Sequence, residues 1–173
     1  MADTADPAAS AGDVRTGVER RCLELPGATL DHPFGETPVV YKIGGRMFAL
    51  VNPERVPPWL SLKLAPEFGL ELRAQYPAQV LPGYHLNKTH WNTFVLDGAL
   101  DLREILDCVE QSYTLVRARL PGRVRTELPA YFPAGPPLAG APRSPSGEPQ
   151  RRSIAPGSGN RREHVGRLGP WKF

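Results

Sequence analysis

The stretch VVYKIGGRMFALV, residues 39–51, decides the predicted fold. Both halves are rich in β-branched and aromatic residues, which favour strands. Gly44-Gly45 lies between them and can supply the positive φ angles that a tight primed turn requires. The stretch therefore predicts a β-hairpin formed by residues 39–43 and 47–51.

Further strands are expected on both sides of this hairpin. Residues 59–64, WLSLKL, alternate apolar and polar side chains, which predicts a third strand with Ser61 and Lys63 facing solvent. An edge strand is expected within residues 29–34, and a last strand at residues 93–96. Residues 78–92 are expected to form a loop.

Apolar residues that recur every three to four positions predict three helices. The first begins at Asp13 and is stopped by Pro26-Gly27, and the second begins at Pro66. The third begins at Asp101, where Glu104 would complete a capping box. The residues expected to face inward are Val14, Val18, Cys22 and Leu25 in the first, Phe68 and Leu72 in the second, and Leu102, Ile105, Leu106, Val109, Tyr113, Val116 and Leu120 in the third.

The order of these elements predicts the fold class. Strands grouped between flanking helices, without repeated βαβ units, indicate an α+β fold with an antiparallel sheet. The chain has 173 residues, of which 40% are hydrophobic and 23% charged, which suits one globular domain. We therefore expect a single compact α+β domain with helices N-terminal and C-terminal to its sheet.

Net charge divides the chain into two parts. Residues 134–173 carry seven lysines and arginines against two glutamates, a net charge of +5, and contain seven prolines and seven glycines. Residues 1–133 carry the other fourteen cations and sixteen anions, a net charge of −2. We expect disorder at 1–12, a folded domain at 13–133, and a disordered basic tail at 134–173.

Composition also narrows the cellular context. No run of about 18 apolar residues occurs, so we expect no membrane-spanning segment. The opening MADTADPAASAGD lacks the basic and apolar regions of a secretory signal, which favours a cytoplasmic location. Heavy use of arginine, alanine and proline indicates a GC-rich bacterial genome.

Few residues point to catalytic chemistry. The sequence contains no P-loop, Rossmann fingerprint, Gly-x-Ser-x-Gly elbow or Cys-x-x-Cys motif. Cys22 and Cys108 lie in predicted amphipathic helices, which favours buried thiols over a disulfide or a metal role. His85 and His90, together with the distant His32, could converge on a metal, but hydrogen-bonding roles are commoner for such histidines. We therefore expect a non-enzyme with no catalytic residue, cofactor or metal.

Residues 83–92, GYHLNKTHWN, differ from ordinary loop sequence because they combine aromatic residues with histidines, asparagines and a lysine. Such a segment offers rings for stacking and donors for phosphate oxygens. Alternatively, Tyr84 and Trp91 could fill the core while Asn87 and Asn92 satisfy turn backbone. The residues themselves leave both interpretations open.

Four landmarks resemble the MmcQ/YjbR family, in the same order along residues 14–120. They are CLELPGA at 22–28, SLK at 61–63 with Pro66-Glu67, HLNKTHW at 85–91 and LDG at 96–98. The resemblance implies a compact α+β fold described as a double wing, and it implies DNA binding. The basic tail is not part of this family pattern.

The resemblance also nominates residues for contact with DNA: Lys63, Asn87, Lys88, His90 and Trp91, with Lys42 and Arg46 on the hairpin as wing contacts. Because the domain carries net negative charge, its cations would have to gather on one face. The function implied is weak, largely sequence-nonspecific DNA binding. The alternative is a protein-interaction module whose folded core has no nucleic-acid role.

Overall fold

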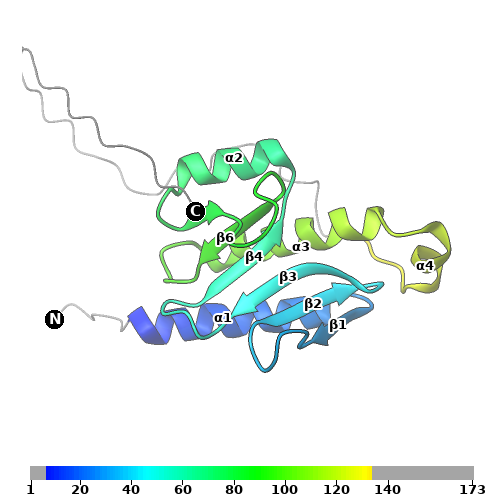
Figure 1. Cartoon of the computed structure of the whole chain (residues 1–173), viewed down its shortest axis with the longest axis horizontal. Coiled ribbons are helices and arrows are strands. Elements are labelled where there is room, and N and C mark those ends of the chain that lie inside the picture. Colours follow the sequence, from blue (N-terminus) through cyan, green and yellow to red (C-terminus); the bar gives the residue numbers. More distant parts are fainter. Residues whose placement is uncertain (1–6, 134–173) are drawn as a thin grey trace, which may run out of the picture. The chain divides into compact units, whose positions relative to one another are not determined.

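The computed structural model describes residues 7–133, and the side chains from residue 11 onward. Its helices are α1 (Pro7–Glu24), α2 (Pro66–Gln75), α3 (Leu102–Ala118) and α4 (Gly122–Glu127). Its strands are β1 (Ala28–Asp31), β2 (Val39–Ile43), β3 (Arg46–Asn52), β4 (Trp59–Lys63), β5 (Val80–Pro82) and β6 (Trp91–Val95). The strands form one sheet in the order β1-β2-β3-β4-β6-β5 (Figure 1).

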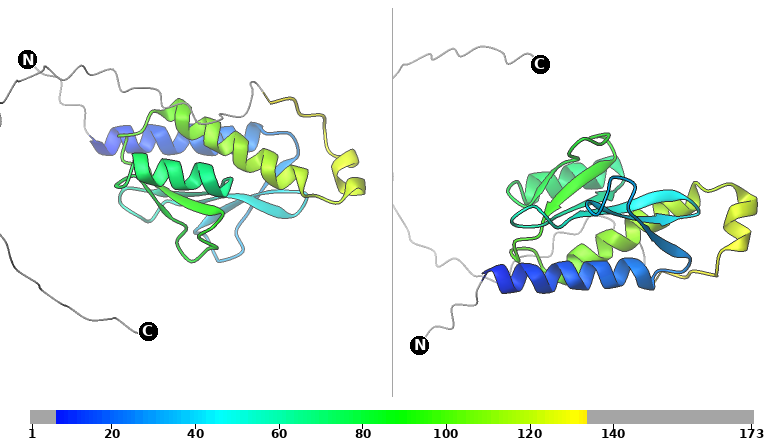
Figure 2. Two further views of the ribbon diagram at one scale, coloured as in Figure 1. Left: turned by 90° about the horizontal axis from the view of Figure 1, so that it is seen from above. Right: turned by 60° about the horizontal axis from the view of Figure 1, so that its bottom comes forward.

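Every neighbouring pair of strands is antiparallel. Helices α1, α2 and α3 lie on one side of the sheet and leave the other side without helices (Figure 2). We call these sides the covered face and the open face. This arrangement confirms the predicted α+β domain with an antiparallel sheet and flanking helices.

The hydrophobic core lies between the covered face and the helices. All four residues expected to face inward from the first helix are buried, and those of the other two helices are either buried or packed against the core. Phe48 is fully buried, and its ring meets the Tyr113 ring edge-on with centroids 5.5 Å apart. The amphipathic patterns in the sequence therefore identified the core correctly.

The predicted hairpin is present as β2 and β3. Gly44 and Gly45 have φ angles of 52° and 77°, as a primed turn requires. A Cβ atom on Gly44 would lie 2.9 Å from side-chain atoms of Leu120 and Val124, so the turn packs tightly against the end of α3 and the start of α4. Glycine at this position thus serves both the turn and the packing.

A serine from α3 joins β3 and β4 where their regular pairing ends. The last paired residues are Ala49 and Leu62. At the next position, the Ser112 hydroxyl donates to the Phe48 carbonyl at 2.5 Å and accepts from the Lys63 amide at 2.8 Å. This buried hydroxyl takes the place of direct strand pairing, and it anchors the end of β4 from which the Lys63 side chain extends.

The N-terminal boundary was predicted wrongly. Helix α1 begins at Pro7, so the expected disorder at 1–12 does not hold for residues 7–12. Proline is tolerated in the first turn of a helix, and the alanines that follow have high helix propensity. Residues 1–6 and the expected disordered tail at 134–173 lie outside the described residues.

Two expectations about the strands also need correction. β6 begins at Trp91, and the predicted loop at 78–92 contains the short strand β5. Ser61 is buried and does not face solvent, because its hydroxyl lies 3.1 Å from the Thr93 hydroxyl and the chain at Tyr84 crosses above them. The alternation of apolar and polar residues along β4 correctly predicted on which face of the sheet Ser61 lies. It could not show that the chain at Tyr84 covers this residue.

The third helix is capped only in part as expected. The Asp101 carboxylate accepts a hydrogen bond from the Arg103 amide at 2.8 Å, which is the expected N-cap. The Glu104 carboxylate instead accepts from the Tyr76 hydroxyl at 3.3 Å. The capping box is therefore half formed, and Glu104 links α3 to the end of α2.

Candidate functional site

The open face presents alternate residues of the central strands. Trp59, Ser61 and Lys63 of β4 point to this face, and Trp91 of β6 pairs with Lys63. The first residue of β3, Arg46, lies at the same end of the sheet as Lys63. Two of the nominated cations therefore lie at one end of the sheet.

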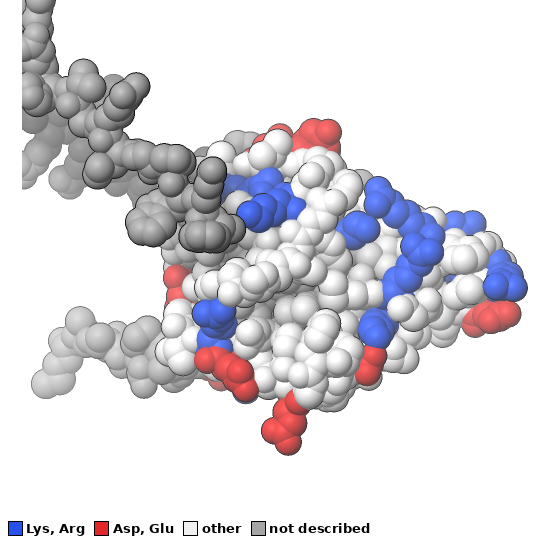
Figure 3. Space-filling view, viewed as in Figure 1, with Lys and Arg blue, Asp and Glu red and all other residues white. Residues whose placement is uncertain are grey.

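The positive charges of Arg46 and Arg119 both act on Lys63 at this end, and we call Arg46, Lys63 and Arg119 the basic cluster. The pKa of Lys63 lies below its ordinary value, chiefly because burial penalises the charged amine, and then because of the positive charges of Arg119 and Arg46. Figure 3 shows lysine and arginine side chains in an arc on the right-hand part of this face.

The basic cluster has no acidic partner among residues 7–133. None of the five ion pairs found there involves Arg46, Lys63 or Arg119. Like charges held together without counter-charges repel, and a bound anion would relieve that repulsion. The arrangement is thus suited to a phosphate or another oxyanion.

Lys42 shares the hairpin with Arg46 but is already engaged. Its ammonium group forms an ion pair with the Asp31 carboxylate across β1 and β2. This hydrogen bond from Lys42 is the main reason that the pKa of Asp31 lies below its usual value. Lys42 therefore has less charge to offer a ligand than Lys63.

Asn87 and His90 have clear structural roles in the loop before β6. The Asn87 side chain accepts from the Thr89 amide at 2.9 Å, and its carbonyl accepts from the Trp91 amide at 2.8 Å. The His90 carbonyl accepts from the Leu64 amide at 2.7 Å. These contacts favour the turn-forming interpretation for Asn87, while the imidazole of His90 remains half-buried.

Trp91 and Lys88 differ in exposure. The Trp91 side chain is only 9% exposed, and a Cβ atom on Gly83 would come within 2.7 Å of its Cβ, so this tryptophan is tightly packed. Lys88 is exposed, and its carbonyl accepts from the Arg73 guanidinium at 3.2 Å. The structure thus favours a packing role for Trp91 and leaves Lys88 available to solvent.

A second group on the open face was not predicted from the sequence. The Arg55 guanidinium lies 4.5 Å from the ring centroid of Trp59 and 5.2 Å from that of Tyr84. The two rings meet edge-on at 5.4 Å, and the His85 ring lies 4.0 Å from Tyr84. We call these four residues the Arg55 stack. The unusual composition of residues 83–92 was a signal for Tyr84 and His85, but nothing marked Arg55.

Residues 7–133 offer little evidence for a metal site or a reactive thiol. No three histidine, cysteine, aspartate or glutamate side chains in this range lie together as metal ligands would. Cys22 and Cys108 are free and buried, as predicted, and burial raises the pKa of each thiol to about 12. Both thiols are therefore protonated near neutral pH and poorly nucleophilic.

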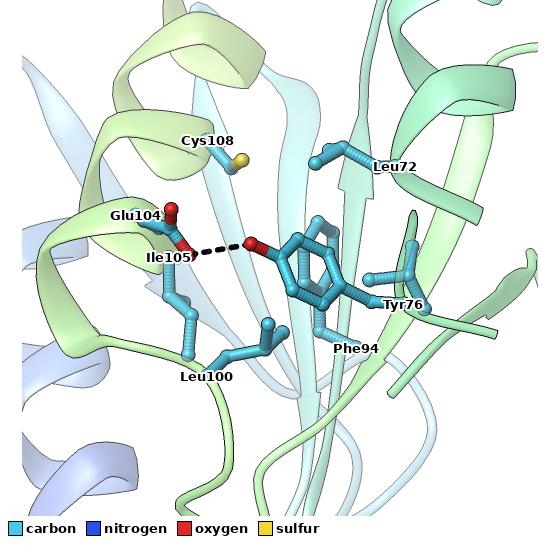
Figure 4. A pocket seen from close by; sticks show the side chains of 8 residues that line it. Leu72, Tyr76, Phe94, Leu100, Glu104, Ile105 and Cys108 are labelled. Carbon is cyan, nitrogen blue, oxygen red and sulfur yellow. Dashed lines mark hydrogen bonds between the residues drawn. The ribbon is translucent and has the colours of Figure 1, made fainter. Parts of the chain in front are cut away.

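A small apolar hollow lies between α2, α3 and the sheet (Figure 4). Leu72, Tyr76, Phe94 and Cys108 line it, and Glu104 reaches in to bond the Tyr76 hydroxyl. Burial, followed by the nearby Glu104 charge, raises the pKa of Tyr76. The Tyr76 ring fills much of this space, which makes the hollow a packing defect at the edge of the core.

No helix within residues 7–133 is long and apolar enough to cross a membrane.

Comparison with known proteins gives consistent relatives. YbdF of Escherichia coli O157:H7 is 37% identical over 98 residues, covering 57% of this chain and 80% of YbdF. YjbR of Escherichia coli K12 is 36% identical over 109 residues, covering 62% of this chain and 90% of YjbR. The crystal structure of Deinococcus radiodurans protein DR2400, a DUF419 domain, has a TM-score of 0.64 at 36% identity, covering 76% of this chain and 97% of that chain.

The family model described as YjbR matches residues 23–115, which extend from α1 through most of α3. This range contains all six strands and three of the four landmarks in full, and it begins within the first. The match therefore confirms the resemblance drawn from the sequence. The chain belongs to the YjbR family.

Proposed function

We propose that the domain binds DNA weakly, and largely without sequence preference, through the basic cluster at one end of its sheet. One observation carries the proposal: Arg46 and Arg119 both lie close enough to Lys63 for their charges to act on it, and none of the three has an acidic partner in the described part of the chain. Cations that contact phosphates position a protein on nucleic acid without reading its sequence.

The number of cations sets the expected strength. Three or four phosphate contacts correspond to a plot of log affinity against log salt concentration with a slope of about −3 to −4. Residues 1–133 carry net charge −2, so no broad positive field reinforces the cluster. Binding should therefore be weak at physiological salt. Lys88 is the remaining nominated cation with an exposed side chain, and we include it as a peripheral contact.

Fluorescence anisotropy of a labelled DNA duplex, titrated with the full chain at several salt concentrations, tests this proposal. The variant Arg46→Ala/Lys63→Ala removes two cations of the cluster. The control Arg20→Ala/Arg103→Ala removes two exposed cations from α1 and α3, outside the cluster. We expect the first variant to flatten the salt slope by about 2, and the control to leave it nearly unchanged.

Equal effects of the two variants would contradict the proposal. They would mean that affinity follows total charge and not the basic cluster. The tail at 134–173 is present in every protein compared, so its arginines cannot produce a difference between the variants. A melting temperature measured for each variant shows whether the fold has been kept.

The second candidate function is a protein-interaction module, which the edge strand β1 favours. β1 has a neighbour on one side only, and Leu30 within it and Phe34 in the connection after it are 42% and 68% exposed. A free strand edge can accept an extended peptide. By contrast, Phe48 and Trp91 are too deeply buried to contribute to an exposed apolar patch. Both candidates treat the domain as a binding module and not as an enzyme.

A further inference from the structure

The Arg55 stack presents exposed planar groups on which another planar group can stack. The Arg55 guanidinium covers part of both the Trp59 and the Tyr84 rings, which limits its motion. Arg55 is nevertheless exposed, and Tyr84 is 49% exposed. A guanidinium plane and an aromatic ring, both accessible to solvent, can stack against a nucleobase.

The backbone beneath the stack is held in place. The Tyr84 amide donates to the Thr93 hydroxyl at 3.1 Å, and that hydroxyl also lies 3.1 Å from the Ser61 hydroxyl. The next residue, His85, has a φ angle of 54°, the left-handed conformation that few residues other than glycine adopt. The chain therefore turns sharply here and places Tyr84 across the open face against Trp59.

One residue of the stack and one residue of the basic cluster lie on the same strand and the same face. Trp59 and Lys63 are four positions apart in β4, and their side chains point to the open face. At the rise of a β-strand, this separation is about 13 Å. A nucleic-acid strand of a few nucleotides can cover that distance, with phosphates at one end and a base at the other.

We propose that the open face binds single-stranded nucleic acid, with an unpaired base stacked on Arg55 and Tyr84 while neighbouring phosphates lie at the basic cluster. In a duplex the faces of the bases are already stacked on one another, so the platform gains nothing from duplex DNA. This inference rests on the proposed function and adds the class of ligand that the site prefers.

Anisotropy titrations with the full chain and three labelled ligands test the inference. The ligands are a single-stranded oligonucleotide, an abasic strand with the same number of phosphates, and a duplex. We expect the chain to bind the base-containing strand at least about fivefold more tightly than the abasic strand, since stacking on one aromatic group contributes at least that much.

The variant Arg55→Lys separates stacking from charge, because lysine keeps the positive charge but lacks the planar guanidinium. It should lose most of the preference for the base-containing strand while binding the abasic strand as before. Arg20→Lys, on the exposed surface of α1, is the matched control and should change neither affinity. Tyr84→Phe keeps the ring and should keep the preference.

The possible failures are distinguishable. Equal binding of the base-containing and abasic strands, or an unchanged preference in Arg55→Lys, overturns the stacking site while phosphate binding at the basic cluster stands. Absence of binding to all three ligands overturns the proposed function as well. Tighter binding of the duplex than of the single strand also contradicts the inference.

Discussion

The two faces of the sheet use alternate residues of the same strands for opposite purposes. On the covered face, Leu60 and Leu62 of β4 are fully buried under the helices. On the open face, Trp59 and Lys63 of that strand belong to two polar groups with accessible charges. The covered face therefore provides stability, while the open face keeps like charges together at a cost in stability. This difference supports the proposal that the open face is the functional one.

The largest effect should follow from opening a cavity on the covered face. Phe48→Ala removes a fully buried ring that contacts Tyr113, and we expect it to lower the free energy of unfolding by about 3–5 kcal/mol. Leu50→Ala, on the open face of the same strand, starts from a half-buried side chain and should cost about 1–2 kcal/mol. Urea unfolding measures both, and equal losses would break the comparison between the faces.

The next largest difference in the free energy of unfolding should come from removing a hydroxyl group on each side of the sheet. Ser112→Ala deprives the Phe48 carbonyl and the Lys63 amide of their shared partner, and should cost about 2 kcal/mol. Ser61→Ala removes one contact to Thr93, but the Thr93 hydroxyl still accepts the hydrogen bond from the Tyr84 amide. This variant should therefore lower the free energy of unfolding by less than about 1 kcal/mol. The same unfolding titration measures both. A Ser112→Ala loss no larger than that of Ser61→Ala would show that the bridge between β3 and β4 is unimportant.

Local patterns in the sequence were sufficient for most of the fold. Gly44-Gly45 between two apolar runs specified the hairpin, because only a primed turn joins such strands tightly. Apolar spacing specified the helices, since the residues that must be buried recur at the helical period. The short strand β5 escaped prediction because its three residues have no alternation of their own and exist as a strand only by pairing with β6.

The candidate site was predictable only in part. Residues 83–92 stood out by composition, and Lys63 and Arg46 were nominated through the family landmarks. Arg119 at the end of α3 could not be nominated, because its closeness to Lys63 results from the packing of α3 against the sheet. Likewise, Arg55 lies in a turn and meets Tyr84 only after β6 has paired with β4. Sites assembled from distant segments leave no local pattern.

Removing a charge from the open face should change the free energy of unfolding in the opposite direction from removing a side chain on the covered face. Lys63→Gln relieves repulsion from Arg46 and Arg119, and should raise stability slightly, by less than about 1 kcal/mol. Because the folded-state pKa of Lys63 is lowered, the penalty is fully present below that pKa. It fades as pH rises towards the unfolded pKa of about 10.4. Urea unfolding at neutral pH and at pH about 10 should therefore show the advantage of Lys63→Gln shrinking, and a clear loss of stability at neutral pH would contradict this.

The smallest effect should come from Lys42, whose charge is already paired. Lys42→Gln removes the main cause of the lowered pKa of Asp31, so that pKa should rise towards its ordinary value. The stabilising contribution of this pair is present above the unfolded pKa of Asp31 and is lost as pH falls through the folded pKa. NMR titration of the Asp31 carboxyl measures the change.

DNA affinity should fall less in Lys42→Gln than in Lys63→Gln, because Asp31 already neutralises Lys42 whereas no ion pair within residues 7–133 involves Lys63. Equal losses of affinity would mean that the ligand displaces Asp31, and that the pairing of Lys42 does not separate these two lysines in function.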